Sequence, residues 1–222
     1  MNPVDLRLYG ILDTGRLGGD PMRLADLARA AVRGGCTLLQ LRDKSADTRA
    51  MIARARVLAT AELGVPVLVN DRVDVALAAG ADGVHLGQDD MAPADARRLL
   101  GPSAIVGLTL KSAAHADALY RERVDYGCVG GVFATASKDN PDPPVGLAGL
   151  NRVVFRGRLA RGPGFPIGAI AGIDAENAAG VIGAGADGVA VIAALFLSDD
   201  VEAAARRLRA AVDGALAARG AA

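Results

Sequence analysis

The chain has 222 residues, of which 51% are hydrophobic and 23% are charged, and these values exclude a largely disordered protein. Lys plus Arg and Asp plus Glu number 25 each, so the formal net charge is zero and no nucleic-acid partner is expected. The two cysteines, the lack of a signal-like start and the shortness of every apolar run predict a cytoplasmic protein with no membrane partner.

Short apolar runs alternate with longer segments rich in Ala, Leu and Arg along the whole chain. The apolar runs are nearly continuous, which is typical of parallel strands covered on both faces. Eight of them are predicted as strands: Leu6–Asp13, Thr37–Asp43, Pro66–Asn70, Gly83–Gly87, Ala104–Thr109, Tyr126–Phe133, Pro166–Ile173 and Gly188–Ala193.

The segments between these runs are predicted as helices. The last helix is the clearest, because apolar residues from Val201 to Leu216 recur at helical spacing in one stripe. The phrase Ala-Asp-Gly-Val occurs twice, at residues 81–84 and 186–189. Each copy closes a helix and opens a strand, which indicates a repeated βα unit.

Eight βα units without a domain linker predict a single (β/α)8 TIM barrel domain over residues 1–222. An open doubly wound sheet is the alternative, but the turn at residues 13–19 does not have clean GxGxxG spacing. Two stretches exceed a minimal barrel. Asp139–Pro144 follows a strand and is expected to form a lid, whereas Arg156–Gly164 precedes a strand and is expected to be an inert insertion at the opposite end.

In a barrel of this kind, the carboxyl ends of the strands build the active site. Gln40, Arg42 and Lys44 share one face at the end of the second predicted strand, and acidic residues follow the third and fourth. Carboxylates among cations and hydroxyls favour a magnesium–pyrophosphate group. Exposed main chain after Gly172 and around Ile192 favours a second phosphate.

The acidic residues also have a structural interpretation. Asp71 would cap a helix that begins at Arg72, and Asp89 or Asp90 would cap the predicted helix Ala92–Leu100.

The inward residues of the strands have structural interpretations too. Gln40 and Arg42 would form a structural polar layer in the barrel. His85 is expected to be a core histidine with its hydrogen bonds satisfied and no catalytic role. Cys128 is expected in the core rather than as a nucleophile, since no basic partner lies beside it in the sequence.

Five segments, taken together, resemble the thiamine-phosphate synthase family over nearly the whole chain. They are Q-L-R-D-K at Gln40–Lys44, V-N-D-R-V-D-V-A at Val69–Ala76, G-A-D-G-V-H-L-G-Q-D-D at Gly80–Asp90, V-F-A-T-A-S-K at Val132–Lys138 and A-D-G-V-A-V-I at Ala186–Ile192.

The resemblance implies a role for each matching position. The site for the aminopyrimidine diphosphate would contain Gln40, Leu41, Arg42, Asp43, Lys44, Asn70, Thr109 and Lys138. The site for the thiazole phosphate would contain Thr135, Ala136, Ser137, Gly172, Ile192 and Ala193. Asp71 and Asp90 would bind Mg²⁺, and Arg42, Lys44 and Lys138 would be the catalytic cations.

The implied activity is that of a transferase. It would couple 4-amino-2-methyl-5-(diphosphooxymethyl)pyrimidine with thiazole phosphate or its carboxylated form, and it would release thiamine phosphate and pyrophosphate by a magnesium-assisted dissociative substitution. The partners are then small-molecule substrates, and a homo-oligomer is left open.

The chain departs from the family pattern at several positions. Leu110 replaces the second of two hydroxyl residues after the fifth strand, and Ser137 replaces a threonine with its hydroxyl kept. Gly131 replaces a proline, Ala171 replaces the first of two glycines, and Ala193 replaces a serine. Two alternatives stay open. A thiazole tautomerase-like isomerase would carry a histidine where Gly131 stands, and a non-catalytic paralogue that binds thiamine precursors is favoured by the hydroxyl lost at Ala193.

Overall fold

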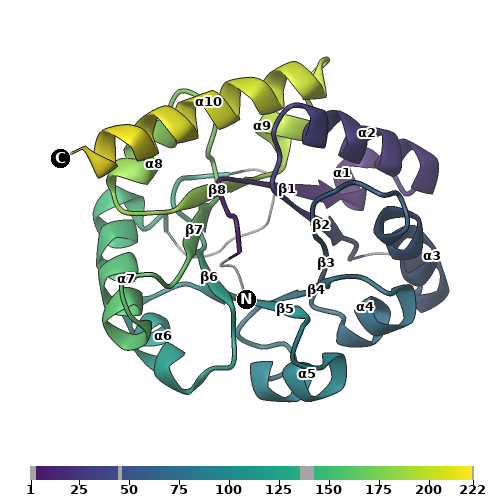
Figure 1. The fold of residues 1–222 in the computed structure, drawn as a ribbon, viewed down its shortest axis with the longest axis horizontal. Coiled ribbons are helices and arrows are strands. Elements are labelled where there is room, and N and C mark those ends of the chain that lie inside the picture. The colour runs from purple at the N-terminus through teal and green to yellow at the C-terminus, as the bar shows by residue number, and fades with distance from the viewer. Residues whose placement is uncertain (1–3, 45–46, 136–142, 222) are drawn as a thin grey trace.

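A closed barrel of eight parallel strands forms the centre of the molecule, and helices surround it (Figure 1). This computed structural model describes residues 4–44, 47–135 and 143–221. Strands are neighbours in chain order, and β1 closes the ring by pairing with both β2 and β8. The predicted TIM barrel is therefore confirmed, while the extent of the domain over residues 1–222 stays a prediction.

Each predicted strand is present, with slightly different bounds. The strands are β1 (Leu8–Asp13), β2 (Leu38–Arg42), β3 (Val67–Asn70), β4 (Gly83–Leu86), β5 (Ile105–Leu110), β6 (Tyr126–Val129), β7 (Ile167–Ile170) and β8 (Gly188–Val191).

Helices follow the strands and cover the outside of the barrel. They are α1 (Thr14–Leu17), α2 (Pro21–Arg33), α3 (Thr48–Ala59), α4 (Val73–Ala79), α5 (Pro93–Leu100), α6 (Ala113–Ala118), the 3-10 turn η1 (Leu119–Arg121), α7 (Gly146–Arg161), α8 (Ala178–Gly183), α9 (Ala193–Phe196) and α10 (Val201–Gly220). The predicted apolar stripe of the last helix is confirmed, since Ala204, Leu208 and Val212 of α10 are buried.

The nearly continuous apolar strands divide their side chains between two separate cores. Even-numbered residues of β1 such as Leu8 and Leu12 belong to the outer core between the barrel and the helices. Odd-numbered residues such as Tyr9 and Ile11 belong to a smaller core inside the barrel. Because both faces are buried, the hydrophobic pattern has no polar alternation, as parallel sheets require.

Two strands end three or four residues earlier than the sequence predicts, for a reason of backbone geometry. β6 ends at Val129 instead of Phe133, and Gly131 beyond it has φ of 71°. β7 ends at Ile170 instead of Ile173, because Ala171 and Gly172 have φ of 97° and 63°. Positive φ values are incompatible with an extended strand, so the apolar runs continue past the hydrogen-bonded ladder.

The expected insertion at Arg156–Gly164 is wrong, because most of it is the last part of helix α7. Arginine is a good helix former, and it interrupts the apolar pattern without interrupting the helix. Gly157 lies against β7, where an added Cβ would approach the side chain of Ile167 to 2.7 Å. The glycine that suggested a loop thus allows close packing of helix on strand.

The repeated Ala-Asp-Gly-Val phrase has a physical basis at the amino-terminal end of the barrel. The carboxylate of Asp82 accepts a hydrogen bond from the N–H of Val67 at 2.7 Å, and that of Asp187 accepts from Ile167 at 2.9 Å. Asp125 makes the same contact with the start of β5. Each aspartate precedes one strand and holds the start of the strand before it.

The glycine of each repeat is required by the same close approach. A Cβ on Gly83 would lie 1.9 Å from the carbonyl oxygen of Ile105, and one on Gly188 would lie 1.7 Å from that of Leu6. No side chain fits at such distances, so both copies keep glycine.

No helix among the residues described here combines the length and the apolar character needed to cross a membrane.

Candidate active site

The carboxyl ends of the strands surround a cavity that eight of the thirteen described site residues line. Gln40, Arg42, Asn70, Thr109, Thr135, Gly172, Ile192 and Ala193 form part of its wall. Ala136, Ser137 and Lys138, together with most of the expected lid at Asp139–Pro144, lie outside the described residues. Five predicted site residues are described but are not part of this wall, namely Leu41, Asp43, Lys44, Asp71 and Asp90.

Strand β2 sends its side chains alternately into the cavity and into the helix layer. Gln40 and Arg42 line the cavity, whereas Leu41 belongs to the outer core. Asp43 also points away from the cavity and forms an ion pair with Arg54 of α3 at 2.5 Å. Any contact of Leu41 or Asp43 with a substrate would therefore have to use the main chain.

The guanidinium of Arg42 is held by a carboxylate from the neighbouring strand. Asp13 pairs with Arg42 across the β1–β2 register and forms an ion pair with its Nη1 atom. The Asp13 side chain is only 4% exposed, so the pair lies in a partly dry environment. Arg42 thus has a fixed direction towards the cavity, which is what binding of an anionic oxygen needs.

Asp71 adopts an unusual backbone conformation just after β3. Its φ is 61°, a left-handed conformation that Asp tolerates better than most residues. Helix α4 begins only at Val73, with Arg72 as its N-cap and no side-chain cap bond. The helix-cap interpretation of Asp71 is therefore wrong, and its carboxylate instead forms an ion pair with Lys44.

Asp90 brings a second carboxylate to the same place. It accepts a hydrogen bond from the N–H of Gly87 at 2.7 Å and does not cap α5, whose N-cap is Ala92. Burial raises the pKa of Asp90, and the adjoining carboxyl of Asp71 raises it further. The two predicted metal ligands therefore lie side by side.

These two carboxylates fit the donor set that Mg²⁺ takes in phosphate-binding sites. Mg²⁺ is usually held by one or two carboxylates, with substrate phosphate and water completing its coordination. Within the described part of the chain, no group of three or more His, Cys, Asp or Glu side chains is placed to hold a metal. The arrangement thus suits an ion shared with a diphosphate rather than one enclosed by protein.

The ends of β7 and β8 contribute small and aliphatic residues to the cavity wall, among them Ala171, Gly172 and Ala193. Gly172 approaches the carbonyl oxygen of Ala134 so closely that an added Cβ would lie 2.5 Å from it. Phe133 donates its N–H to the carbonyl of Ala171 at 3.1 Å, which ties the segment after β6 to the end of β7. Small residues and turned main chain are the usual phosphate-binding features of barrels at these two strands.

The cavity wall also contains four titratable side chains that were not assigned to the site from the sequence. Tyr9, His85 and Cys128 point inward from β1, β4 and β6, and Lys111 follows β5. His85 is buried and hydrogen-bonded, as expected for a core histidine. The Cys128 thiol is buried and its pKa is raised to about 12, so it does not supply a thiolate. For Tyr9, His85 and Cys128, strand parity was the available signal, because these three side chains share the inward face.

Comparison with known proteins agrees with this geometry. The sequence profile of the family described as thiamine monophosphate synthase matches residues 8–195. A thiamine-phosphate synthase of Agrobacterium fabrum is 50% identical over 222 residues, covering 99% of each chain. One of Chloroflexus aurantiacus is 47% identical over 211 residues, covering 94% of each.

Solved structures show the same similarity. A thiamine phosphate pyrophosphorylase from Pyrococcus furiosus superposes with a TM-score of 0.81 at 36% identity, covering 96% of this chain and 98% of that one. A 3-hexulose-6-phosphate synthase shares the fold alone, with a TM-score of 0.65 at 20% identity over 93% of this chain and 99% of the other. Profile, sequence and structural similarity agree that this chain belongs to the thiamine monophosphate synthase family.

Proposed function

We propose that this protein is a thiamine-phosphate synthase. It would join the aminopyrimidine methylene diphosphate to the thiazole phosphate, or to its carboxylated form, and release pyrophosphate. The observation that carries the proposal is a set of charged side chains at the carboxyl ends of neighbouring strands. Arg42 lines the cavity, and the Lys44–Asp71 pair, which adjoins the carboxyl of Asp90, follows the ends of β2, β3 and β4. Cations beside a two-carboxylate site are suited to a departing diphosphate.

The substitution breaks the bond between the methylene carbon and the diphosphate oxygen, and the electron pair leaves with pyrophosphate. The thiazole nitrogen then forms the new bond to that carbon. Arg42, fixed by Asp13, and Lys44 are proposed to neutralise the leaving oxygens. Lys138 is proposed for the same role. A carboxylated thiazole would also lose CO₂.

Asp71 and Asp90 are proposed to hold Mg²⁺, which when bound would neutralise charge on the diphosphate. The apolar residues of the cavity wall, such as Ile11 and Ile170, would limit the access of water to the electron-poor methylene carbon. No protein nucleophile is needed, in agreement with the unreactive character of the buried Cys128 thiol. A cytoplasmic location and a homo-oligomer stay predictions.

Incubation with both precursors, with and without Mg²⁺, tests the function. We expect thiamine phosphate and pyrophosphate in equal amounts and only with the metal. Isomerisation of a thiazole without Mg²⁺ would favour a tautomerase, and binding of both precursors without product would favour a non-catalytic paralogue.

Replacing Asp71 with Asn tests the metal site. Asn adopts the left-handed conformation as readily as Asp, so Asp71→Asn should fold normally while losing one anionic ligand. We expect the rate of pyrophosphate release to fall by about 10²-fold or more. The rate should recover in part at high Mg²⁺, because the variant has lost only one of the two carboxylate ligands.

The matched control is Asp74→Asn, two residues into the same helix start, whose carboxylate faces Arg72. It should keep the normal rate. Full activity of Asp71→Asn at ordinary Mg²⁺ would contradict the proposed role of Asp71.

A further inference from the structure

Lys111, directly after β5, is a cation of the cavity wall to which the proposed mechanism gives no role. It lines the cavity and is exposed. Among the described residues, no carboxylate forms an ion pair with its ammonium group, whereas Arg42, which lines the same cavity, is paired with Asp13. A cation in this position can bind an anionic ligand without first giving up a protein partner.

The main chain of Lys111 is fixed although its side chain is not. Its N–H donates to Nδ1 of His115 at 3.2 Å, and the side chain of Ser112, the N-cap of α6, accepts from the N–H of His115 at 3.2 Å. These two bonds hold the first turn of α6 at the end of β5. The base of the Lys111 side chain therefore has a set position, and only its methylene stem has to be ordered when an anion binds.

The end of β5 is joined to the loop that carries Asp90. The amide Nε2 of Gln88 donates to the carbonyl oxygen of Thr109 at 2.5 Å, and Asp90 in the same loop accepts from the N–H of Gly87 at 2.7 Å. Lys111 is two residues beyond Thr109, and both residues line the cavity. Lys111 thus follows the strand on one side of the proposed metal ligands, while the cations of β2 follow the strand on the other side.

The charges already placed at the diphosphate site do not balance those of the ligand. Three carboxylates and two cations of the described residues make direct contacts there, namely Asp13, Asp71, Asp90, Arg42 and Lys44. Together they carry one net negative charge, and Mg²⁺, when bound, changes this to one net positive charge. A diphosphate ester carries about three negative charges near neutral pH, so about two of them are left over. Lys138 is proposed to neutralise one, and Lys111 is placed to neutralise the other.

We propose that Lys111 is a further binding residue for the diphosphate, and that its ammonium group contacts the phosphoryl oxygens from the β5 side while Arg42 and Lys44 contact them from the β2 side. This inference rests on the proposed function. The leaving pyrophosphate gains negative charge as the bond from carbon to oxygen breaks. The contact therefore strengthens in the transition state, and it lowers the barrier as well as binding the substrate.

Calorimetric titration with inorganic pyrophosphate in the presence of Mg²⁺ tests this contact without turnover. Lys111→Gln should weaken pyrophosphate binding about tenfold, because it removes one charged hydrogen bond. Lys111→Arg should keep most of the affinity, because the positive charge remains. The difference between the parent protein and Lys111→Gln should shrink at high salt, since an exposed charge is screened.

Arg207→Gln is the matched control for the loss of one charge. Arg207 is also exposed and forms no ion pair with a described residue, but it lies on α10 and is not part of the cavity wall. Arg207→Gln changes the net charge as Lys111→Gln does, and it should bind pyrophosphate as tightly as the parent protein.

Steady-state kinetics with both substrates identify the anion that Lys111 contacts. Lys111→Gln should raise KM for the aminopyrimidine diphosphate and lower kcat, while KM for the thiazole phosphate should not change. A raised KM for the thiazole phosphate alone, with pyrophosphate binding unchanged, would overturn the inference, because Lys111 would then bind the second substrate.

This inference and the proposed function can fail separately. If the parent protein forms thiamine phosphate and Lys111→Gln equals it in pyrophosphate affinity, only the inference fails. If the parent protein neither binds pyrophosphate with Mg²⁺ nor forms product, the proposed function fails and the inference fails with it.

Discussion

Ala171 has a backbone conformation that residues with side chains rarely adopt. Its φ is 97°, at the point where β7 turns into the cavity wall, and the family pattern has glycine there. A residue with a side chain in this region destabilises the folded state by about 1–3 kcal/mol. Glycine avoids this strain but lowers stability by about 0.4–1 kcal/mol, because it increases the conformational entropy of the unfolded chain.

Replacing Ala171 with Gly should therefore stabilise the protein by about 1 kcal/mol, measured from urea unfolding midpoints at constant slope. The neighbouring change Gly172→Ala is the matched control with the opposite sign. It combines φ of 63° with a Cβ only 2.5 Å from the Ala134 carbonyl, so it should destabilise. A lower urea midpoint for Ala171→Gly than for the parent protein would contradict backbone strain at Ala171.

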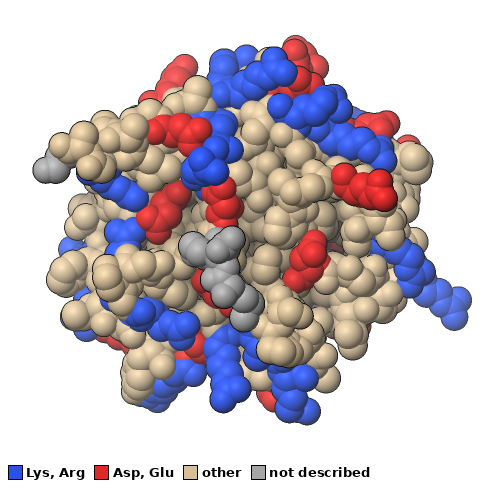
Figure 2. All heavy atoms as spheres, in the orientation of Figure 1, with Lys and Arg blue, Asp and Glu red and all other residues tan. Residues whose placement is uncertain are grey.

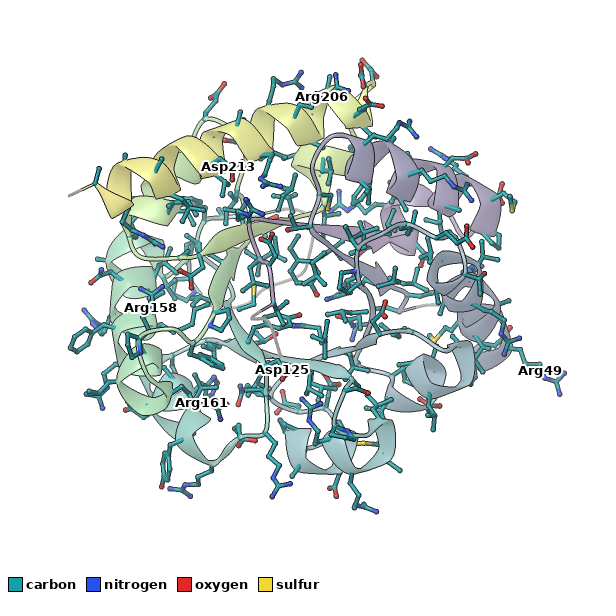
Figure 3. The ribbon with its side chains drawn as sticks, viewed as in Figure 1. Arg49, Asp125, Arg158, Arg161, Arg206 and Asp213 are labelled. Carbon is teal, nitrogen blue, oxygen red and sulfur yellow. The ribbon has the colours of Figure 1, made fainter. Side chains whose placement is uncertain are left out.

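At the scale of elements, Asp187 joins three parts of the barrel at the end opposite the cavity. Besides the N–H of Ile167 at the start of β7, it binds Arg158 of α7 at 2.7 Å and Arg219 of α10 at 3.0 Å. Figure 3 shows Arg158 on α7, with Asp125, the equivalent residue before β6, in the same view. One carboxylate thus connects a strand to two helices.

Asp187→Ala should destabilise the protein by about 2 kcal/mol, because three donors lose a charged acceptor. Urea unfolding measures the loss, and the turnover number of the folded variant should not change. Asp213→Ala is the matched control, since Asp213 is 44% exposed and forms only surface pairs with Arg209 and Arg7. Its cost should stay below about 1 kcal/mol. Equal losses in the two variants would contradict the joining role.

Element boundaries were the least predictable level. The apolar runs at Tyr126–Phe133 and Pro166–Ile173 predicted the strand starts to within one residue but placed the ends too late, because hydropathy does not register a positive φ at Gly131 or Ala171. Helix α7 was missed in part because Arg156–Gly164 has no apolar period. Position and type of each strand followed from composition, whereas its last residue depended on local backbone geometry.

At the scale of the whole molecule, charges of both signs are interspersed on the face seen in Figure 2, in keeping with the zero net charge. The titratable groups of the interior behave differently. Burial raises the pKa of the Cys36 and Cys128 thiols to about 12, and it raises the pKa of Tyr9 and Tyr126 above the usual value.

This interior predicts a loss of stability in alkali. Above about pH 8.5 the unfolded chain releases thiol protons that the folded chain keeps, so the unfolded state binds fewer protons and unfolding becomes easier as pH rises. Each such group contributes up to about 1.4 kcal/mol per pH unit, and the phenols add to this above about pH 10.

The free energy of unfolding, measured in urea at pH 7, 9 and 10.5, should fall across this series. Cys36→Ala should show a shallower fall than the parent protein, whatever its stability at pH 7. A free energy of unfolding that stays constant from pH 7 to pH 10.5 would contradict the raised pKa values of these buried thiols and phenols.

The sequence by itself determined the eight βα units, the closed barrel and the polar residues at the strand ends, because these depend on periodicity and on residue type. The tertiary structure decided which neighbour each polar group has. Three such contacts join residues of different strands or of the segments that follow them. Asp13 holds Arg42, Asp71 faces Lys44 instead of capping α4, and His85 contacts Thr109. Hydropathy along one strand contains no information about which side chain lies opposite on the next strand, because the register and the closure of the sheet decide which residues become neighbours.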